Sequence, residues 1–387
     1  MRRRLAIFVV VLGIAAAFVW QLPELVDERQ NKILVKPPYS VSDKALVLHR
    51  QLTVVDLHAD SLLWGRDLLD RDTIGHVDIP RLADGNVALQ IFSLPTKTPR
   101  GLNIERNDDK TDNITLLAIA ERWPIATWNS LTQRALYQAR RLHQFANGSR
   151  GGFVVIQSSA DLANYLGRRA QNRNLTAGLL SIEGAHALDG KLENLDALYG
   201  AGYRMMSPSH FFDNDIGGAA AGVGKIGLTD KGREWVRQME ARHMIVDLAH
   251  ASPKTIDDVL AVATRPVVVS HTGVKGTCNN NRNLSDEQIR AIAAKGGLIG
   301  IGYWDTATCG TDAKAIVRAM RYVSNIVGAE HLALGSDFDG AVTEPFDTTG
   351  LAKITEAMQQ AGFSEAEIRM VMGENAVKFL LENLPEK

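Results

Sequence analysis

The sequence has no excess of charge of either sign. Its 387 residues include 43 lysines and arginines and 44 aspartates and glutamates, which gives a formal net charge of -1. Nucleic-acid backbones and strongly anionic surfaces select proteins with a large positive excess. We therefore expect no nucleic-acid partner. The chain also lacks repeats and low-complexity tracts, and its 45% hydrophobic content argues against wholesale disorder.

Long apolar runs are missing as well, except at the amino terminus. There, Arg2, Arg3 and Arg4 precede an uncharged run from Leu5 to Trp20. Sixteen helical residues span about 24 Å, which is short for a hydrocarbon core of about 30 Å but sufficient in a thin bilayer. We interpret residues 1–21 as a signal anchor, with a cleaved signal peptide as the alternative. The arginines would stay in the cytoplasm, which places the rest of the chain on the extracytoplasmic, periplasmic side.

Cysteine is scarce, with only Cys278 and Cys309 in the chain. Their spacing matches neither a zinc ribbon nor a redox motif. An exported protein meets conditions in which thiols pair, so one disulfide between these two residues is plausible. Two free buried cysteines that pack as small hydrophobes are the alternative.

The rest of the chain reads as a tether followed by one large domain. Residues 22–46 are polar, contain Pro37 and Pro38 and lack periodicity, which predicts a polar tether. Residues 47–387 form the expected folded domain, with an insertion at about 97–147. Nine short apolar runs within it are candidate strands: 53–57, 87–94, 152–156, 177–182, 203–206, 244–248, 266–269, 298–302 and 331–335.

The pattern between these runs predicts the fold class. Helix signals alternate with the strands, and Thr229, Ser252, Ser285 and Ser364 are expected at helix N-termini. Continuous Val, Ile and Leu runs indicate strands that are buried on both faces, as in parallel sheets covered by helices. We expect an α/β fold, a TIM-like (β/α)8 barrel, with a doubly wound open sheet as the second choice.

Chemically competent side chains follow the predicted strands, where such barrels build their active sites. These candidates are His58, Asp60, Glu183, His210, His250, His271 and Asp337. In an extended backbone, His58 and Asp60 point to the same side and could chelate one metal ion. Two neutral imidazoles, His250 and His271, are usual zinc ligands. Together with Glu183 they fit a pair of divalent cations bridged by a carboxylate.

These residues lie in blocks that resemble the signature segments of the membrane dipeptidases, also called renal dipeptidases. The blocks are Val54–Asp60, Ser181–His186, Val246–His250, Val269–His271 and Gly335–Gly340. Their order and spacing match over roughly residues 50 to 382. Five blocks in register are far more specific than any single motif.

The resemblance implies a fold, a metal content and a role for each residue. The family has a metal-dependent (β/α)8 barrel with two zinc ions and hydrolyses dipeptides. By resemblance, His58 and Asp60 bind the first zinc, His250 and His271 bind the second, and Glu183 bridges both. His210 resembles the histidine that polarises the substrate carbonyl, Arg282 the arginine that binds the substrate carboxylate, and Asp337 the catalytic acid and base.

We therefore expect a zinc-dependent dipeptidase that cleaves dipeptides with a free C-terminal carboxylate by a bridging water activated by two metal ions. One alternative is a two-metal amidohydrolase acting on another small amide, such as an N-acyl amino acid or a β-lactam. Another is an inactive, membrane-tethered binding protein on the same fold. The expected partners are a small dipeptide substrate and a membrane, and a homodimer is one option for the assembled protein.

The remaining polar residues near these blocks receive weaker assignments. His186 and Asp339 are candidates for orienting the ligands, with a purely structural role equally open. Asp56 is interpreted as a structural acceptor. The histidines outside the strand ends are interpreted as structural; they are His76, His143, His243 and His331.

Overall fold

The computed structural model describes residues 21–387, so the predicted signal anchor lies outside the described residues except for its last position. Within the described part of the chain, no helix combines the length and the apolar character needed to cross a bilayer.

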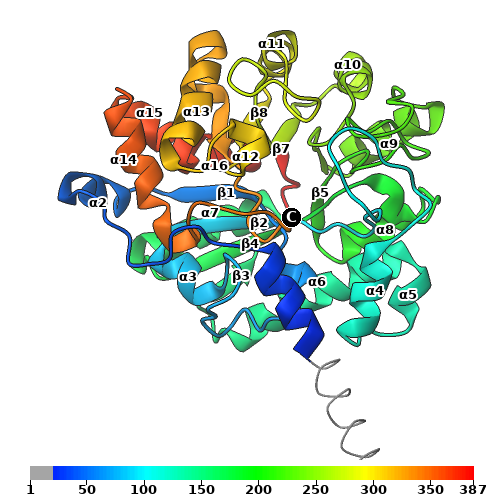
Figure 1. Ribbon diagram of the computed structural model, residues 1–387, viewed down its shortest axis with the longest axis horizontal. Helices are drawn as coiled ribbons and strands as arrows, with labels where there is room; N and C mark the ends of the chain where they lie inside the picture. Colours follow the sequence, from blue (N-terminus) through cyan, green and yellow to red (C-terminus); the bar gives the residue numbers. More distant parts are fainter. Residues whose placement is uncertain (1–20) are drawn as a thin grey trace, which may run out of the picture.

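All nine predicted strands are present, and they form one parallel sheet (Figure 1). They are β1 (Val54–Ala59), β2 (Val87–Phe92), β3 (Phe153–Val155), β4 (Thr176–Ile182), β5 (Tyr203–Met206), β6 (Ile245–Val246), β7 (Val268–Thr272), β8 (Leu298–Ile301) and β9 (Leu332–Leu334). The strand order is β6-β5-β4-β2-β1-β9-β8-β7. A bridge between Asp247 and Val268 joins the two end strands, so the sheet closes on itself.

Strand β3 lies beside the ring formed by the other eight strands and is not part of it. It pairs with residues Thr176 to Gly178 of β4, whereas β5 pairs with Leu180 to Ile182 along the same edge. The two strands therefore share one edge of β4, and eight strands complete the ring.

Helices surround the sheet in Figure 1. Those that follow strands are α3 (Ile79–Asp84), α6 (Leu131–Gly148), α7 (Ser159–Gln171), α8 (Asn194–Gly200), α9 (Asp230–Ala241), α10 (Pro253–Val262), α11 (Asp286–Ala294), α12 (Asp305–Thr308), α13 (Ala313–Val327), α14 (Ala352–Gln360), α15 (Glu365–Arg369) and α16 (Asn375–Asn383). The four predicted caps are confirmed, because the side chains of Thr229, Ser252, Ser285 and Ser364 each accept a hydrogen bond from the first turn of a helix.

Both faces of the sheet are buried, as the continuous apolar runs predict. Val55 and Leu57 of β1 share a cluster with Phe379 and Leu380 of α16, whereas Val54 belongs to the other core cluster. Alternate residues of a strand point to opposite faces, so no face of β1 is left to solvent.

The expected insertion at 97–147 divides into two parts. Its first part carries two short helices, α4 (Asn113–Ala120) and α5 (Ala126–Asn129), which are separated at Pro124. Its second part is α6, whose buried residues Ala135, Ala139 and Leu142 join the main core. Helix α6 is therefore a regular helix of the barrel, and the extra structure ends near residue 130.

The segment predicted as a tether is bound along the barrel. Residues 21–30 are helical, Ile33 pairs with Glu344, and the Tyr39 hydroxyl donates a 3.0 Å hydrogen bond to Asp347. A further helix, α2 (Asp43–His49), begins inside the predicted tether. We call residues 21–40 the N-terminal strap. Its polar side chains are the reason for the difference, since Asp27 is buried and has partners on the barrel.

Candidate active site

The predicted donor side chains meet at the carboxyl ends of the strands. His58 and His271 lie in β1 and β7, and Glu183 directly follows β4. The Oε1 atom of Glu183 is the centre of the cluster. It lies 3.3 to 3.4 Å from the Nε2 atoms of three histidines, which are His58, His250 and His271.

The remaining predicted residues surround this centre. His210 places Nε2 at 3.1 Å from Oε2 of Glu183. Oδ1 of Asp60 and Oδ1 of Asp337 lie 3.5 and 3.7 Å from Nε2 of His58. The structure thus brings all seven strand-end candidates into one buried cluster.

The donor set fits divalent cations. Nε2 of His58, Oδ1 of Asp60 and Oε1 of Glu183 are buried and have no hydrogen-bond partner. Buried polar atoms without partners are rare in folded proteins, and an ion is one of the usual reasons for them. Three overlapping groups place donor atoms within 4.8 Å of one another, and Glu183 belongs to two of them. Imidazole nitrogen and carboxylate oxygen are both ordinary zinc ligands.

The electrostatics of the carboxylates point the same way. Burial raises the pKa of Glu183 well above its usual value, and repulsion from Asp60 adds to this effect. Burial raises the pKa of Asp337 to about 7, with Asp60 again raising it and His58 opposing. Three carboxyl groups crowded away from water repel one another, and bound cations would remove that repulsion.

The histidines divide into two kinds. Burial lowers the pKa of His250 and of His271 well below the usual value, so their imidazoles are neutral and carry a lone pair for a metal ion. Burial also lowers the pKa of His58, but Glu183 and Asp60 outweigh it and raise the pKa to about 10. The carboxylates around His58 therefore favour positive charge at this point of the cluster.

Ser270 is a supporting residue that the sequence analysis missed. Its hydroxyl oxygen lies 2.9 Å from Nδ1 of His271 and 3.4 Å from Nδ1 of His58. A hydroxyl oxygen can accept two hydrogen bonds, so it can hold both rings with Nδ1 protonated and Nε2 free. The only signal in the sequence was that Ser270 directly precedes His271. The contact with His58 arises from the fold.

Two buried aspartates shape the backbone that carries the ligands. Asp56 accepts hydrogen bonds from the backbone N–H of His58 and from the backbone and hydroxyl of Ser336, as its predicted structural role requires. Asp247 accepts from the backbone N–H groups of Ala249 and Ser270. Each aspartate thereby ties two neighbouring strand ends together.

The loop at Asp337 has an unusual backbone. Asp337 and Asp339 adopt φ values of 68° and 63°, in the left-handed region. Gly340 makes room for this turn, because a Cβ atom there would lie 2.2 Å from Oδ1 of Asp337. The Asp-Phe-Asp-Gly sequence is therefore a turn that aims Asp337 at the cluster.

Asp339 anchors this loop to the strap. Its carboxylate accepts from the Ser61 hydroxyl at 2.5 Å and pairs with Arg66 at 2.8 Å. Arg66 also pairs with Asp27 of the strap at 2.8 Å. Burial alone would raise the pKa of Asp339, but Arg66 and His76 hold it well below the usual range. Asp339 thus orients the turn rather than taking part in the ligand cluster.

His76 connects the loop at Asp339 with the strap. Its Nδ1 accepts the backbone N–H of Asp339 at 3.0 Å, and its Nε2 lies 3.2 Å from the carbonyl oxygen of Lys32 in the strap. His186 is buried against Phe212, and neither of its ring nitrogens has a hydrogen-bond partner.

The other three histidines that the sequence analysis interpreted as structural lie outside the ligand cluster. His143 and His331 each bond a backbone carbonyl oxygen, and His243 contacts Arg265. Their interactions are local and structural.

Arg282 lies at the edge of the cluster. Its Nη2 donates a 2.9 Å hydrogen bond to the carbonyl oxygen of His271, and its guanidinium lies 5.6 Å from the ring centroid of Trp304. Burial lowers its pKa, while Asp337 and Glu183 oppose that effect. The contacts with His271 and Trp304 hold the planar guanidinium in one orientation. Only one of its five N–H groups is used in the hydrogen bond to His271.

A disulfide between Cys278 and Cys309 ties the loop of Arg282 to the segment that follows Trp304. The predicted pairing is therefore present, and neither cysteine is free. The bond closes a loop of 31 residues.

We expect removal of this bond to lower stability more than activity. For a loop of that length, the chain-entropy model gives a loss of about 3 to 4 kcal/mol in the free energy of unfolding. Urea denaturation of the Cys278→Ala, Cys309→Ala double variant measures it. An equal midpoint in oxidised parent and variant would contradict the expectation.

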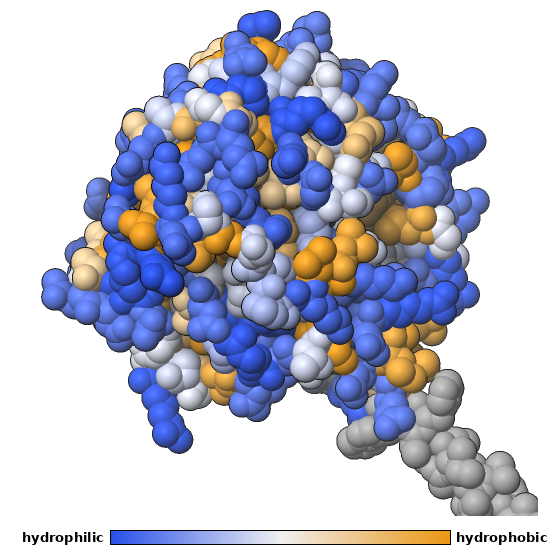
Figure 2. All heavy atoms as spheres, turned by 60° about the vertical axis from the view of Figure 1, so that its left-hand side comes forward, coloured by the Kyte–Doolittle hydropathy of each residue, from blue (hydrophilic) through white to orange (hydrophobic). Residues whose placement is uncertain are grey.

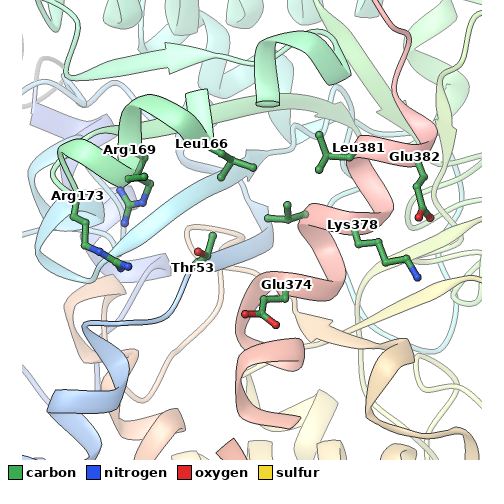
Figure 3. A pocket seen from close by; sticks show the side chains of 10 residues that line it. Thr53, Leu166, Arg169, Arg173, Glu374, Lys378, Leu381 and Glu382 are labelled. Atoms are coloured by element: carbon green, nitrogen blue, oxygen red, sulfur yellow. The ribbon is translucent and has the colours of Figure 1, made fainter. Parts of the chain in front are cut away.

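A cavity of 470 Å³ elsewhere is not part of this site (Figure 3). It lies between α7 and α16 beside Thr53, which precedes β1, so it opens at the amino ends of the strands. Arg169 and Arg173 come from one wall and Glu374 and Lys378 from the other in Figure 3. Active sites of parallel barrels form at the opposite end.

The fold and the cluster together define a class of protein. A parallel α/β barrel that gathers imidazoles and carboxylates at the carboxyl ends of its strands is typical of metal-dependent hydrolases. The chain matches the family described as Membrane dipeptidase (Peptidase family M19) over residues 42–384. It therefore belongs to this family and is a metallodipeptidase, which confirms the predicted resemblance.

Among individual relatives, one is named a dipeptidase and another is uncharacterized. The chain is 28% identical over 321 residues to dipeptidase tcpJ of Claviceps purpurea, a match that covers 81% of this chain and 70% of the relative. It is 30% identical over 254 residues to an uncharacterized protein in the pqqA 5' region of Klebsiella pneumoniae, covering 62% of this chain and 92% of the relative.

Solved structures share the fold. A metallo peptidase from Rhodobacter sphaeroides, liganded with a phosphinate mimic of the dipeptide L-Ala-D-Ala, matches with a TM-score of 0.69 and 23% identity over 86% of this chain and 99% of that chain. The probable dipeptidase PvdM from Pseudomonas aeruginosa matches with a TM-score of 0.72 and 18% identity over 88% and 98%.

Proposed function

We propose that the protein is a zinc-dependent dipeptidase with a site for two zinc ions and a preference for dipeptides with a free C-terminal carboxylate. The observation that carries the proposal is the unpartnered Oε1 atom of Glu183, which lies within 3.4 Å of three imidazole nitrogens. His58 and Asp60 would hold one ion. His250 and His271 would hold the other, with Glu183 between them.

When bound, the two ions would supply an activated water as nucleophile and neutralise charge on the substrate carbonyl oxygen. The side chains around them supply the remaining chemistry. His210 is neutral, since burial lowers its pKa well below the usual value, and its Nε2 faces the cluster from the side of Glu183 Oε2. It is suited to donate a hydrogen bond to the carbonyl oxygen.

Asp337 is suited to move the proton. Its carboxyl group lies 3.7 Å from His58, and burial raises its pKa to about 7. A carboxyl group with a pKa near the working pH serves as both base and acid, so it can take a proton from water and deliver it to the departing amine.

Arg282 would set the length of the substrate. A guanidinium binds a carboxylate through two parallel hydrogen bonds, and His271 and Trp304 fix the orientation of this one. A fixed distance between Arg282 and the cluster would admit one residue after the scissile bond, so substrates with two or more residues after that bond are excluded.

We expect Arg282→Met to lower kcat/KM for a dipeptide by about a hundredfold or more, chiefly through KM, because a buried charge pair with the substrate is lost. The matched substrate is the same dipeptide with a C-terminal amide, for which parent and variant should be similar. Steady-state kinetics on both substrates measure the ratio. A preference for the free acid that survives the substitution would contradict the role of Arg282.

A substrate panel tests the proposal as a whole. The full chain is stripped of metal with a chelator and assayed with and without added zinc on dipeptides, a tripeptide and an N-acetyl amino acid. Zinc-dependent cleavage of the dipeptides alone is the expected result. Cleavage of only the acylated substrate would instead make the protein an amidohydrolase, the alternative that the sequence left open.

We also propose that residues 1–21 hold the domain at a membrane on its extracytoplasmic side. The apolar run after three arginines supports this location. Alkaline carbonate extraction of membranes that contain the full chain tests it, and release of the protein into the soluble fraction would overturn the anchor.

A further inference from the structure

Helix α4 has more exposed apolar surface than a helix of this kind should. Its sequence, Asn-Ile-Thr-Leu-Leu-Ala-Ile-Ala, is apolar around the whole helix, a pattern typical of a helix buried on all sides. Yet Leu116 and Ile119 are 51% and 44% exposed. Ile125, in the turn between α4 and α5, is 75% exposed and lies between exposed Pro124 and Ala126.

This surface adjoins the start of the described chain. Val26 of the strap packs against the cluster that contains Ile114, Ala118 and Trp123, so the helix of residues 21–30 lies beside α4. The helix of residues 21–30 also has two exposed apolar side chains, Leu22 and Leu25. Figure 2 shows orange side chains gathered at the lower right edge of the body, in the quarter where the described chain begins.

Charge near this surface is mixed. Glu24 and Glu28 on the helix of residues 21–30 are accompanied by Arg29, and Glu121 at the end of α4 is followed by Arg122. The apolar side chains, rather than a basic field, therefore decide what the surface binds.

We propose that Leu22, Leu25, Leu116, Ile119 and Ile125 form a bilayer-facing patch that lies in the interfacial layer of the membrane. The proposal rests on the membrane anchor proposed above, because the apolar run that ends at Trp20 leads directly into the helix that carries Leu22 and Leu25. An anchor would tether the domain but leave its orientation free. The patch fixes the orientation of the barrel relative to the lipid surface.

The test uses the full chain in phosphatidylcholine vesicles. Both native cysteines are in the disulfide, so an added cysteine gives a single labelling site. A fluorophore is attached to Ile125→Cys or, as the matched control, to Val47→Cys. Val47 is also apolar and is 56% exposed. It belongs to α2, which lies across the strands from α4 and α5 in Figure 1. Lipids with a spin-label quencher on the acyl chain are then added.

We expect quenching at position 125 to exceed that at position 47 at least threefold, with little change when anionic lipid replaces a third of the phosphatidylcholine. Equal quenching at the two positions, with the protein still floating with the vesicles, would overturn the patch alone. Loss of co-flotation would overturn the anchor and the patch together. Disulfide-linked dimers of the unlabelled Ile125→Cys variant, together with no quenching of the labelled one, would assign the surface to a second copy of the chain and also overturn the proposal.

Discussion

Replacing Glu183 with glutamine is expected to abolish zinc-dependent hydrolysis while leaving the protein folded. The substitution keeps the shape of the side chain but removes the charge that is proposed to bridge two cations. Metal-site stabilisation is worth several kcal/mol, and each 1.4 kcal/mol is a tenfold change in rate, so kcat/KM should fall by at least about a thousandfold. Metal analysis of the purified variant should show less than two zinc ions per chain.

The stability of the metal-free variant separates this role from a structural one. Burial and repulsion from Asp60 disfavour the charge on Glu183, so the metal-free Glu183→Gln protein should be at least as stable as the metal-free parent. Zinc should raise the unfolding midpoint of the parent only. The matched control is Glu374→Gln, an exposed glutamate at the opposite end of the barrel, which should change neither property (Figure 3). Full activity in Glu183→Gln would refute the bridging role.

The second large effect is expected on stability. The Arg66 guanidinium is buried between Asp27 of the strap and Asp339 of the loop after β9, with a carboxylate oxygen of each at 2.8 Å. Arg66→Met leaves two carboxylates in the interior without their cation, which costs about 3 to 5 kcal/mol in the free energy of unfolding. Urea denaturation at pH 7 measures the loss.

The pH dependence of this loss follows from Asp339. Its pKa is depressed in the folded protein, so the pair stabilises the fold above the unfolded pKa of about 3.9 and loses its effect as the pH falls below it. The gap between variant and parent should therefore narrow below about pH 4. The control is Arg71→Met, whose exposed pair with Asp84 should contribute no more than about 1 kcal/mol. Equal losses in both variants would contradict the buried network.

The sequence was sufficient to predict the strands and the polar side chains that meet at their carboxyl ends. Buried parallel strands carry nearly continuous apolar runs, and a polar residue directly after such a run, as at Glu183, stands out for that reason. The sequence does not show the bridge at Asp247 that closes the ring. It also does not show that β3 and β5 pair with the same edge of β4. The number of predicted strands was therefore one more than the eight strands of the ring. Helix α6 was included in the predicted insertion although it belongs to the barrel.

The supporting contacts could not be predicted, because they join residues far apart in the chain. Ser270 lies 212 residues from His58, and Tyr39 lies 308 residues from Asp347. The strap has the polar, proline-containing composition of a linker. Its side chains are ordered only because Arg66 and the loop after β9 offer partners, and no local pattern records those partners.

The contact between the strap and the loop after β9 also bears on the order in which the enzyme is assembled. Asn31 accepts the backbone N–H of Ala341 across 310 residues, and β1 completes its pairing only with β9. During synthesis the residues of the candidate site emerge one after another, and Asp337 emerges last among them. A nascent chain therefore lacks part of the candidate site until about the last fifty residues are being added.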